Sequence, residues 1–416
     1  MHAGAGDKAT SRKKVALALS LLFSAMLSLY LPFAELALAN MIPVPAINKV
    51  FISSSGSIDP FTPLIVRQGH SYIFTGDFTN TTLVIERDGI TLDGAGHSMT
   101  GHSTSYQQAI DISNRTNITI KNVVFSQFGV GVAMDHASNN TLTENQMFTF
   151  AAFLMVNADN NHIIGNTVTQ GYGIYGSGSY NLIINNSFGG GLSGGGNGMG
   201  VYLSGNNNTI TQNTIIHGVS INMGGSQYNT ISNNTILNGS GSGILLAKSS
   251  NNIVYGNLIG GKTDSESGAL YISHDSFNNV VFQNTFENNA LAIALGAQVA
   301  THVWNNVYDN RFYENDFLNN TQNVWIAPGA PVNFWDNGQQ GNYWSSFQGV
   351  DSNYNGISET PYAMNANNTD THPLMTPHNN LGTLSQIPEY PALTSLLVLI
   401  SAVTLATIVI LKKKKS

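Results

Sequence analysis

The stretches that decide the fold are Asn208-Thr-Ile-Thr-Gln-Asn213, Asn229-Thr-Ile-Ser-Asn-Asn234 and Asn252-Ile-Val-Tyr-Gly-Asn257. Each consists of an Asn, four further residues and a second Asn. The pattern recurs nine times, with its first Asn at positions 117, 140, 161, 181, 208, 229, 252, 279 and 305, so the intervals are 20–27 residues. A repeat of this length with apolar residues inside it predicts a solenoid, because one unit cannot bury its apolar face alone.

The residues within each repeat predict short strands with one buried face. Ile210 and Ile231 lie in the middle of their motifs, and Ile215 and Ile236 follow the second Asn. This alternation is typical of strands. We expect each motif Asn to mark a corner, because Asn tolerates left-handed backbone angles and bonds nearby backbone. Stacked corners would align the Asn amides into ladders along the solenoid.

The sequence therefore predicts an all-β chain, specifically a right-handed parallel β-helix with three short strands per coil. The consensus of leucine-rich repeats is absent, and helical repeats need longer periods. Intervals above the minimum predict protruding loops at Gly189–Gly200, Gly260–Gly268 and Ala290–Val303. Such loops usually line the binding face of a solenoid.

Composition excludes several classes of function. Charged residues make up 9% of the 416 residues, against about 25% in ordinary globular chains. The chain has no cysteine, which excludes disulfides, thiolate zinc sites and a catalytic cysteine. Residues 40–391 contain 8 Lys and Arg and 21 Asp and Glu, a difference of −13. Nucleic-acid binding needs basic surface, so we expect no nucleic-acid partner.

Both ends of the chain predict targeting to the outside of a membrane. A basic start and an uncharged run precede Ala37-Leu-Ala39, which fits a signal peptide with cleavage before Asn40. Leu393–Leu411 is uncharged and long enough to span a bilayer. Four lysines follow this run, and positive residues stay in the cytoplasm. The sequence predicts a single-pass, extracytoplasmic cell-surface protein with a cytoplasmic C-terminus.

These observations divide the chain into seven expected segments. They are a signal peptide (1–39), an N-terminal lead-in and cap (40–82), the β-helix (83–325), an aromatic C-terminal cap with an Asn/Asp-rich turn (326–378), a linker (379–391), a transmembrane helix (392–411) and a basic tail (412–416).

Several stretches resemble the NosD-type family of β-helix proteins. The run Ile90–Gly101 is similar to the opening coil of that family, and the Asn-bounded repeats are similar to its body. Gly341–Ser346 and Asp351–Tyr362 resemble the ending found in archaeal members. The resemblance covers about Leu83 to Leu374 and implies a pectin-lyase-like fold. Bacterial NosD assists copper-site maturation, but a repeat pattern identifies architecture rather than chemistry.

A second resemblance concerns the anchor. Ile387-Pro-Glu-Tyr-Pro391 is similar to the lead-in of many archaeal surface-protein anchors. It implies an archaeal cell surface, with the C-terminal anchor either retained or processed.

Candidate catalytic residues for polysaccharide cleavage are few. Asp111, Asp135 and Asp159 recur at intervals of 24, and His136 follows Asp135. Hydrolysis needs two clustered carboxylates as general acid and base. These three precede their motif Asn by six, five and two residues, so we expect them not to align. Solvated turn carboxylates are the simpler interpretation.

Metal sites are suggested by one segment. Asp351, Asn353, Asn355, Ile357 and Glu359 match the ligand spacing of an EF-hand-type calcium loop, although Tyr362 replaces the last acid. A weak structural calcium site and a self-bonded turn both remain open. Copper is disfavoured, because the histidines lack chelating spacing and the methionines follow strand interiors.

Aromatic residues and sequons supply the last candidates. Trp335, Tyr343 and Trp344 are expected to cap the open end of the solenoid, or to stack on sugars. Sequons at Asn80, Asn114, Asn238, Asn319 and Asn367 are candidate glycosylation sites.

Three hypotheses of function follow. The first is a surface β-helix that binds glycans or forms part of the cell envelope without strong catalysis. The second is an extracellular polysaccharide hydrolase or lyase, and the third is a NosD-like accessory for copper maturation. No cofactor beyond the possible calcium is expected.

Overall fold

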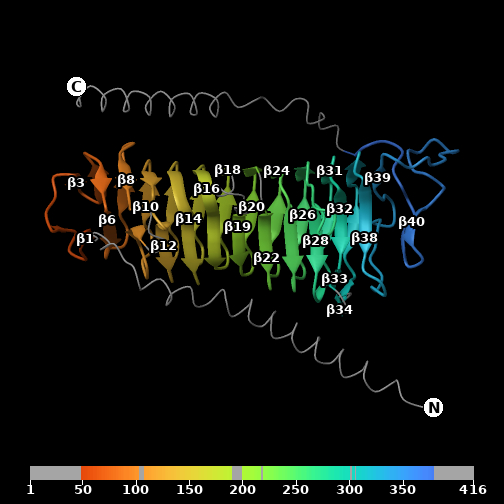
Figure 1. The fold of residues 1–416 in the computed structure, drawn as a ribbon, viewed down its shortest axis with the longest axis horizontal. Helices are drawn as coiled ribbons and strands as arrows, with labels where there is room; N and C mark the ends of the chain where they lie inside the picture. Colours follow the sequence, from red (N-terminus) through yellow and green to blue (C-terminus); the bar gives the residue numbers. More distant parts are fainter. Residues whose placement is uncertain are drawn as a thin grey trace, which may run out of the picture. The chain divides into compact units, whose positions relative to one another are not determined.

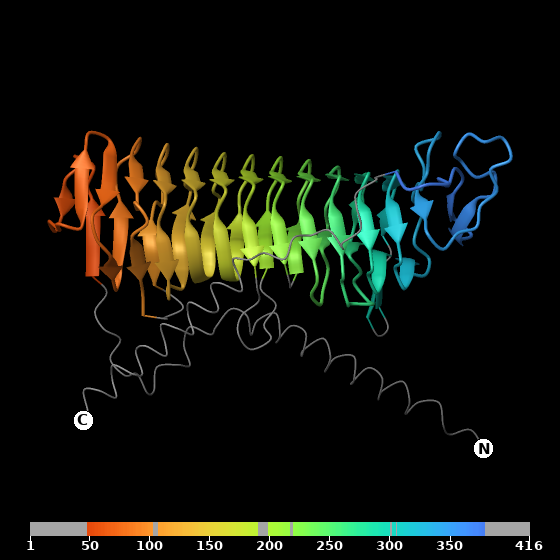
Figure 2. The same cartoon turned by 90° about the horizontal axis from the view of Figure 1, so that it is seen from above.

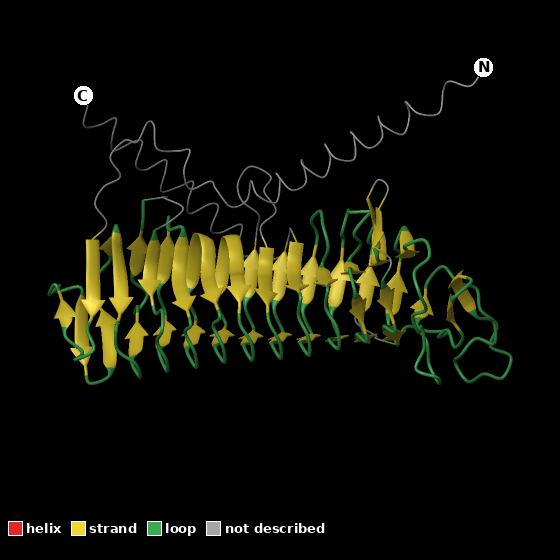
Figure 3. Cartoon of the chain, turned by 90° about the horizontal axis from the view of Figure 1, so that it is seen from below, coloured by secondary structure: helices red, strands yellow, loops and turns green. Residues whose placement is uncertain are grey.

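A computed structural model describes residues 48–102, 107–189, 199–216, 219–299, 302–304 and 306–378. The expected signal peptide, linker, transmembrane helix and basic tail lie outside these residues. Within the described ranges every regular element is a strand (Figure 3). Accordingly, this part of the chain holds no helix with the length and apolar character needed to cross a bilayer.

The strands stack coil upon coil into a parallel solenoid, as expected, with three strands in a typical coil (Figures 1 and 2). The strands inside the eight Asn motifs from Asn117 to Asn279 belong to one 12-stranded sheet, which we call the motif row. Its strands pair in parallel except for the terminal hairpin β3–β4. The motif row comprises β3 (Ile65–Gln68), β4 (Ser71–Phe74), β7 (Thr91–Asp93), β10 (Thr119–Lys121), β13 (Thr141–Thr143), β15 (His162–Ile164), β17 (Leu182–Ile184), β20 (Thr209–Thr211), β23 (Thr230–Ser232), β26 (Ile253–Tyr255), β30 (Val280–Phe282) and β36 (Arg311–Tyr313).

The other two rows join into one 23-stranded sheet, because β14 (Gln146–Val156) and β16 (Thr167–Ser177) run through both. The middle row contains β5 (Phe78–Thr79), β8 (Ser98–Thr100), β11 (Val124–Ser126), β18 (Ser187–Gly189), β21 (Thr214–Ile216), β24 (Thr235–Leu237), β27 (Leu258–Gly260), β31 (Thr285–Glu287), β37 (Asp316–Leu318) and β39 (Tyr343–Trp344). The third row contains β1 (Asn48–Ile52), β6 (Thr81–Ile85), β9 (Gln108–Asp111), β12 (Val130–Asp135), β19 (Met199–Ser204), β22 (Val219–Gly224), β25 (Ile244–Ala247), β28 (Leu270–Ser273), β32 (Leu291–Leu295) and β38 (Gln322–Ile326).

Short strands at the corners and ends complete the described chain. The insertion after β32 forms an antiparallel hairpin, as a protruding loop was expected to lie there. These strands are β2 (Ile58–Asp59), β29 (Ser276–Phe277), β33 (Ala297–Val299), β34 (His302–Trp304), β35 (Val307–Tyr308), β40 (Tyr362–Asn365) and β41 (Asn368–Asp370). Parallel pairing already begins between β4 and β7 and still joins β37 to β39, so the coils extend beyond the expected bounds of 83 and 325.

The core is a set of columns in which equivalent residues of successive coils stack. In the three-residue strands of the motif row the middle residue points inward, and Ile210, Ile231 and Val254 are fully buried and in register. Each of these residues touches its equivalents one coil away, at the 4.7–4.9 Å spacing of paired strands. Full burial of such a side chain contributes about 1.5–3 kcal/mol, so the stack is stabilised by repetition.

Two asparagine ladders hold the corners on either side of the motif row. In the second ladder, Asn213 donates from its backbone N and its Nδ2 to Oδ1 of Asn234, at 2.9 and 3.0 Å. Its Oδ1 accepts the same pair of bonds from Asn186, and its Nδ2 also donates to the Ile183 carbonyl oxygen. The expected ladders are therefore confirmed. The first ladder runs through Asn140, Asn161, Asn181, Asn208, Asn229, Asn252, Asn279, Asn310, Asn333 and Asn368, and the second through Asn145, Asn166, Asn186, Asn213, Asn234, Asn257, Asn284, Asn315, Asn342 and Asp370.

From Asn140 to Asn315, the left-handed corner residue is the one before each ladder Asn, which corrects the expectation that the motif Asn takes this conformation. Asn207 and Gln212, directly before Asn208 and Asn213, have φ of 58° and 56°. The motif at Asn117 is shifted by one residue for the same reason. Asn117 and Asn122 have φ of 57° and 55°, and the ladder positions are taken by Ile118 and Val123.

The motif placed at Asn305 was also assigned to the wrong frame. Asn305 lies outside the described residues, and the ladder passes through Asn310 and Asn315. The preceding interval is therefore 31 residues, from Asn279 to Asn310. The spacing of five between Asn305 and Asn310 imitates the true motif, which explains the misassignment.

Tryptophans and a carboxyl close the C-terminal end of the core. Trp344 is 1% exposed and stacks between Phe317 and Tyr362, with ring centroids 4.1 and 4.3 Å away. Its Nε1 donates to Oδ2 of Asp370 at 2.9 Å, and Asp370 takes the place of an Asn at the end of the second ladder. Burial raises the pKa of Asp370 to about 6, although four donors face its carboxyl oxygens. A side chain at Gly341 would collide with this carboxyl group.

Substitution of one ladder residue tests the ladder energetically. Asn213→Ala leaves the Asn186 amides and the Ile183 carbonyl oxygen without their partner. Each buried polar group without a partner costs about 1–3 kcal/mol, so the free energy of unfolding should fall by about 3 kcal/mol or more. Thr209→Ala, on the outward face of the same coil, should cost less than about 1 kcal/mol. Urea unfolding of the three proteins measures both; equal losses would refute the role of the ladder.

A pH titration tests Asp370. Because its pKa rises from 3.8 to about 6 on folding, the folded protein binds this proton more tightly than the unfolded chain. The associated stability is complete below pH about 4 and is lost as the pH rises through 6, a decline of about 3 kcal/mol. Asp370→Asn keeps an amide in the ladder and should remove this decline. The measurement is the difference in unfolding free energy between the two proteins from pH 4 to 7, and a difference independent of pH would contradict the assignment.

Candidate functional site

The outward face of the third row carries one column of residues in register across many coils. Val84 of β6 pairs with Asp111 of β9, which pairs with Ala133 of β12. The column continues through Leu154, Tyr175, Tyr202, Asn222, Leu245 and Tyr271. The backbone ladders fix this register, because a slip of one residue would turn the outward side chains inward.

Aromatic rings form a continuous, partly exposed stripe over part of this face. Phe150, Tyr172, Tyr175 and Tyr202 contact one another in order, with ring centroids 5.3, 5.4 and 5.1 Å apart. Tyr175 and Tyr202 are nearly parallel, at 24°. Phe150 is 46% exposed and Tyr175 is 42% exposed. We call these four residues the aromatic stripe.

The stripe has a physical origin in the two long strands. β14 and β16 turn the corner between the middle and third rows without a break, which brings Phe150 beside Tyr172. Tyr175 and Tyr202 are neighbours because their strands pair in parallel across an interval of 27 residues, the same interval that separates Asn181 from Asn208. This shared interval is the signal in the sequence that could have predicted the contact between Tyr175 and Tyr202.

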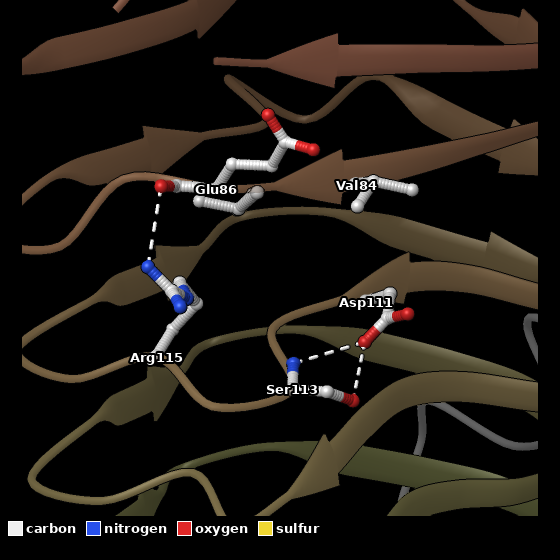
Figure 4. A pocket seen from close by; sticks show the side chains of 6 residues that line it. Val84, Glu86, Asp111, Ser113 and Arg115 are labelled. Carbon is white, nitrogen blue, oxygen red and sulfur yellow. Dashed lines mark hydrogen bonds between the residues drawn. The ribbon is translucent and has the colours of Figure 1, made fainter. Parts of the chain in front are cut away.

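A pocket of about 350 Å³ lies at the N-terminal end of the same face (Figure 4). Val84, Ile85, Glu86, Asp111, Ser113 and Arg115 line it. Oδ1 of Asp111 accepts hydrogen bonds from the backbone N and Oγ of Ser113, at 2.9 and 2.6 Å. Nη1 of Arg115 donates to the Glu86 carbonyl oxygen at 3.2 Å and lies 3.7 Å from the Asp88 carboxylate. The pocket therefore combines carboxylates with a partly neutralised cation.

The candidate catalytic residues inferred from the sequence lie at two separate places in the structure. Asp111 pairs with Ala133 and Asp135 with Val156, so the three aspartates do not align, as expected. Asp135 nevertheless lies on the coil next to Asp111, where its Oδ1 is 2.6 Å from Nδ1 of the exposed His136. Asp159 lies elsewhere, at a motif-row corner, and accepts the Ser179 backbone N–H at 2.7 Å. Glu86 was not among the candidates from sequence, because it precedes the recognisable repeats.

The capping tryptophans offer little to a ligand. Trp335 and Trp344 are each 1% exposed, and Trp335 stacks on Phe312 at 4.4 Å while its Nε1 bonds Oδ1 of Asn368. Tyr343 is half-buried beside them. This arrangement places the two indoles in the cap and not on an open face.

The candidate calcium loop is held by its own side chains. Asp351 accepts the backbone N–H groups of Asn355 and Gly356, at 3.1 and 2.9 Å. Asn355 accepts that of Ile357, and Glu359 accepts that of Ser352. Asn353 likewise accepts the Asn355 N–H. Calcium binding by these residues stays a prediction.

Other candidate positions are distributed over the surface. The sequons at Asn114, Asn238, Asn319 and Asn367 are exposed, whereas Asn80 is half-buried. Donors suited to a transition metal do not gather in the part of the chain that the structure describes, where no three His, Asp or Glu side chains converge. Met134, Met155 and Met223 are fully buried in the core, so they pack rather than face a ligand.

Solved structures of low sequence identity are similar to this solenoid. A double mutant of the periplasmic alginate epimerase AlgG has 13% identity and a TM-score of 0.42, and the match covers 69% of this chain and 82% of that chain. The catalytic domain of a GH87 alpha-1,3-glucanase, in complex with nigerose, has 16% identity and a TM-score of 0.43, with 64% and 56% covered. The Dettilon tailspike protein has 14% identity and a TM-score of 0.40, with 62% and 61% covered.

Sequence comparison gives the more specific result. Among curated proteins none matches this chain. A family model described as periplasmic copper-binding protein (NosD) matches residues 62–219 and again residues 192–349. Together these ranges span the coils from the N-terminal hairpin to the cap. The resemblance inferred from Ile90–Gly101 and the repeats is thereby confirmed, and the chain belongs to the NosD family of parallel β-helix proteins.

Proposed function

We propose that this protein binds a polysaccharide chain along the outward face of its third row, outside the cytoplasm. The aromatic stripe carries the proposal, because a row of partly exposed aromatic side chains offers an apolar surface against which the C–H groups of sugar rings can pack. An exposed apolar patch of this kind marks an interaction site more often than it occurs by chance. The extracytoplasmic location agrees with the description of the family as periplasmic.

The spacing of the stripe suits a polymer. Tyr175 and Tyr202 lie 5.1 Å apart along the solenoid axis, which is close to the length of one sugar residue in an extended chain. Consecutive sugars could therefore meet consecutive coils. The column continues with Asn222 and Leu245, so a polymer following the axis would find a polar and then an apolar contact.

The proposal includes two features that concern the rest of the chain. Residues 392–411 would anchor the protein in a membrane, with the solenoid facing outward and possible envelope glycans as its partners. The loop at Asp351–Glu359 would hold a structural calcium ion, supported by the oxygen donors at alternating positions.

Removal of the stripe rings tests the proposal. The Tyr175→Ala, Tyr202→Ala double variant should lose affinity for a bound polysaccharide about tenfold or more, or about 1.4 kcal/mol. The matched control is Tyr255→Ala, Phe282→Ala, which removes a stacked pair with centroids 5.1 Å apart from the outward face of the motif row. Affinity electrophoresis of the full-length chain against a panel of soluble polysaccharides compares the three proteins. Equal affinity, or an equal loss in the control, would refute binding on the stripe.

A second candidate function is cleavage of the bound polysaccharide, and the pocket supports it. Glu86 and Asp111 face the pocket at the end of the column that contains the stripe. Two carboxylates beside a sugar chain can supply the general acid and the base or nucleophile of hydrolysis.

Neutralising the two carboxylates separates binding from cleavage. If the pocket hydrolyses glycan, Glu86→Gln and Asp111→Asn should each lower the release of reducing ends at least a hundredfold while leaving affinity within threefold. Glu144→Gln, an exposed carboxyl at a motif-row corner, serves as the control. Absence of turnover in the unmodified protein with every bound polysaccharide would exclude the second candidate and leave the first intact.

Copper chemistry does not fit the residues that the structure describes. The family description names copper, but the described His, Asp and Glu side chains form no group of three, and the chain has no cysteine. Copper sites need such donors close together. No copper-dependent step is therefore assigned to this solenoid.

A further inference from the structure

We infer that the aromatic stripe takes an uncharged polysaccharide and discriminates against polyuronates and sulfated glycans; this inference rests on the proposed function. The distribution of charge around the stripe carries it. Recognition of an anionic polymer needs Arg or Lys along the path of the polymer, because each carboxylate or sulfate removed from water must be compensated.

The coils that form the stripe contain no cation of this kind. Residues 122–247, which include all four stripe residues, hold no Lys and no Arg, and their acids are Asp135, Glu144 and Asp159. This gap covers more than a hundred consecutive residues of both described and undescribed chain. The column positions beside Tyr175 and Tyr202 are Leu154, Asn222 and Leu245, and all three side chains are uncharged.

Acidic groups lie at both ends of the path. Glu86 and Asp111 line the pocket at the N-terminal end, and Asp135 lies on the next coil. At the other end lies Tyr271, whose pKa is raised by burial and, to a lesser extent, by the negative charge of Asp264. The two ends would therefore repel an anionic polymer that extends beyond the stripe.

The cations at the two ends of this face lie at the corners of their coils. Arg115 bonds the Glu86 carbonyl oxygen and lies against Asp88. Lys248 follows the last residue of β25 at a left-handed corner, where burial and the charge of Lys248 lower the pKa of His274. Lys262 is buried at the opposite corner, and burial lowers its pKa to about 8. These three cations therefore lie at corners of their own coils, whereas the column beside Tyr175 and Tyr202 carries uncharged side chains that suit a neutral sugar.

A matched pair of polymers tests the inference on the full-length chain. Hydroxyethyl and carboxymethyl derivatives of each neutral polysaccharide that binds share a backbone and differ in charge. At low salt we expect the carboxymethyl form to bind at least tenfold more weakly, and the ratio to shrink as salt screens the acidic ends. Polyuronate or sulfated polymer binding more tightly than every neutral polymer would overturn the inference.

A charge introduced into the column sharpens the test. Asn222→Lys places a cation directly after Tyr202 in the column. It should lower the ratio of the affinities for the hydroxyethyl and carboxymethyl forms at least fivefold. Thr230→Lys adds the same charge on the outward face of the motif row and should leave it unchanged. Equal effects of the two variants would overturn the inference.

If an anionic polymer binds and the Tyr175→Ala, Tyr202→Ala variant abolishes this binding, the proposed function survives and the inference fails. Binding of no polymer at all overturns both.

Discussion

The structure depends on the satisfaction of buried backbone groups at the coil corners. Between strands, the chain turns so sharply that the backbone alone cannot pair every N–H group with the coil above. Each ladder Asn supplies an acceptor to two N–H groups of one neighbouring coil and donates to the other, as Asn213 does with Asn186 and Asn234. A buried polar group without a partner would cost about 1–3 kcal/mol at every corner, so the ladders are a condition for stacking.

The same constraint positions the candidate site. Because each coil is locked to the next at two corners, insertions between the corners change the loops without changing the register of the strands. Tyr175 and Tyr202 are separated by 27 residues and still lie in contact. The column from Val84 through Asp111 to Tyr271 thus remains straight along the solenoid. A linear array of contacts is a property that a globular pocket lacks, and it matches a linear polymer.

The repeat could be predicted from sequence because Asn has a strict geometric role, and the core followed from Ile210, Ile231 and their equivalents. The frame at Asn117 could not, since Asn is favoured both in the ladder and in the left-handed position before it. The frame at Asn305 could not either, because its spacing to Asn310 equals that of a true motif. The aromatic stripe was missed because it arises from pairing between coils and not from any local motif. Glu86 was missed for the same reason, because it lies beside Asp111 in the pocket only when the coils stack. The tryptophans were recognisable as cap residues because an open solenoid end requires large buried side chains, and Trp335 and Trp344 are buried there.

A crystal structure of the full-length chain with a bound oligosaccharide tests the central claim most directly, that ladder-fixed register builds a linear sugar-binding face. The account predicts consecutive sugar rings over Tyr175 and Tyr202, with the oligosaccharide running along the solenoid axis toward Asn222. Sugar bound instead on the motif row beside Tyr255 and Phe282, or at the cap around Tyr343, would contradict it.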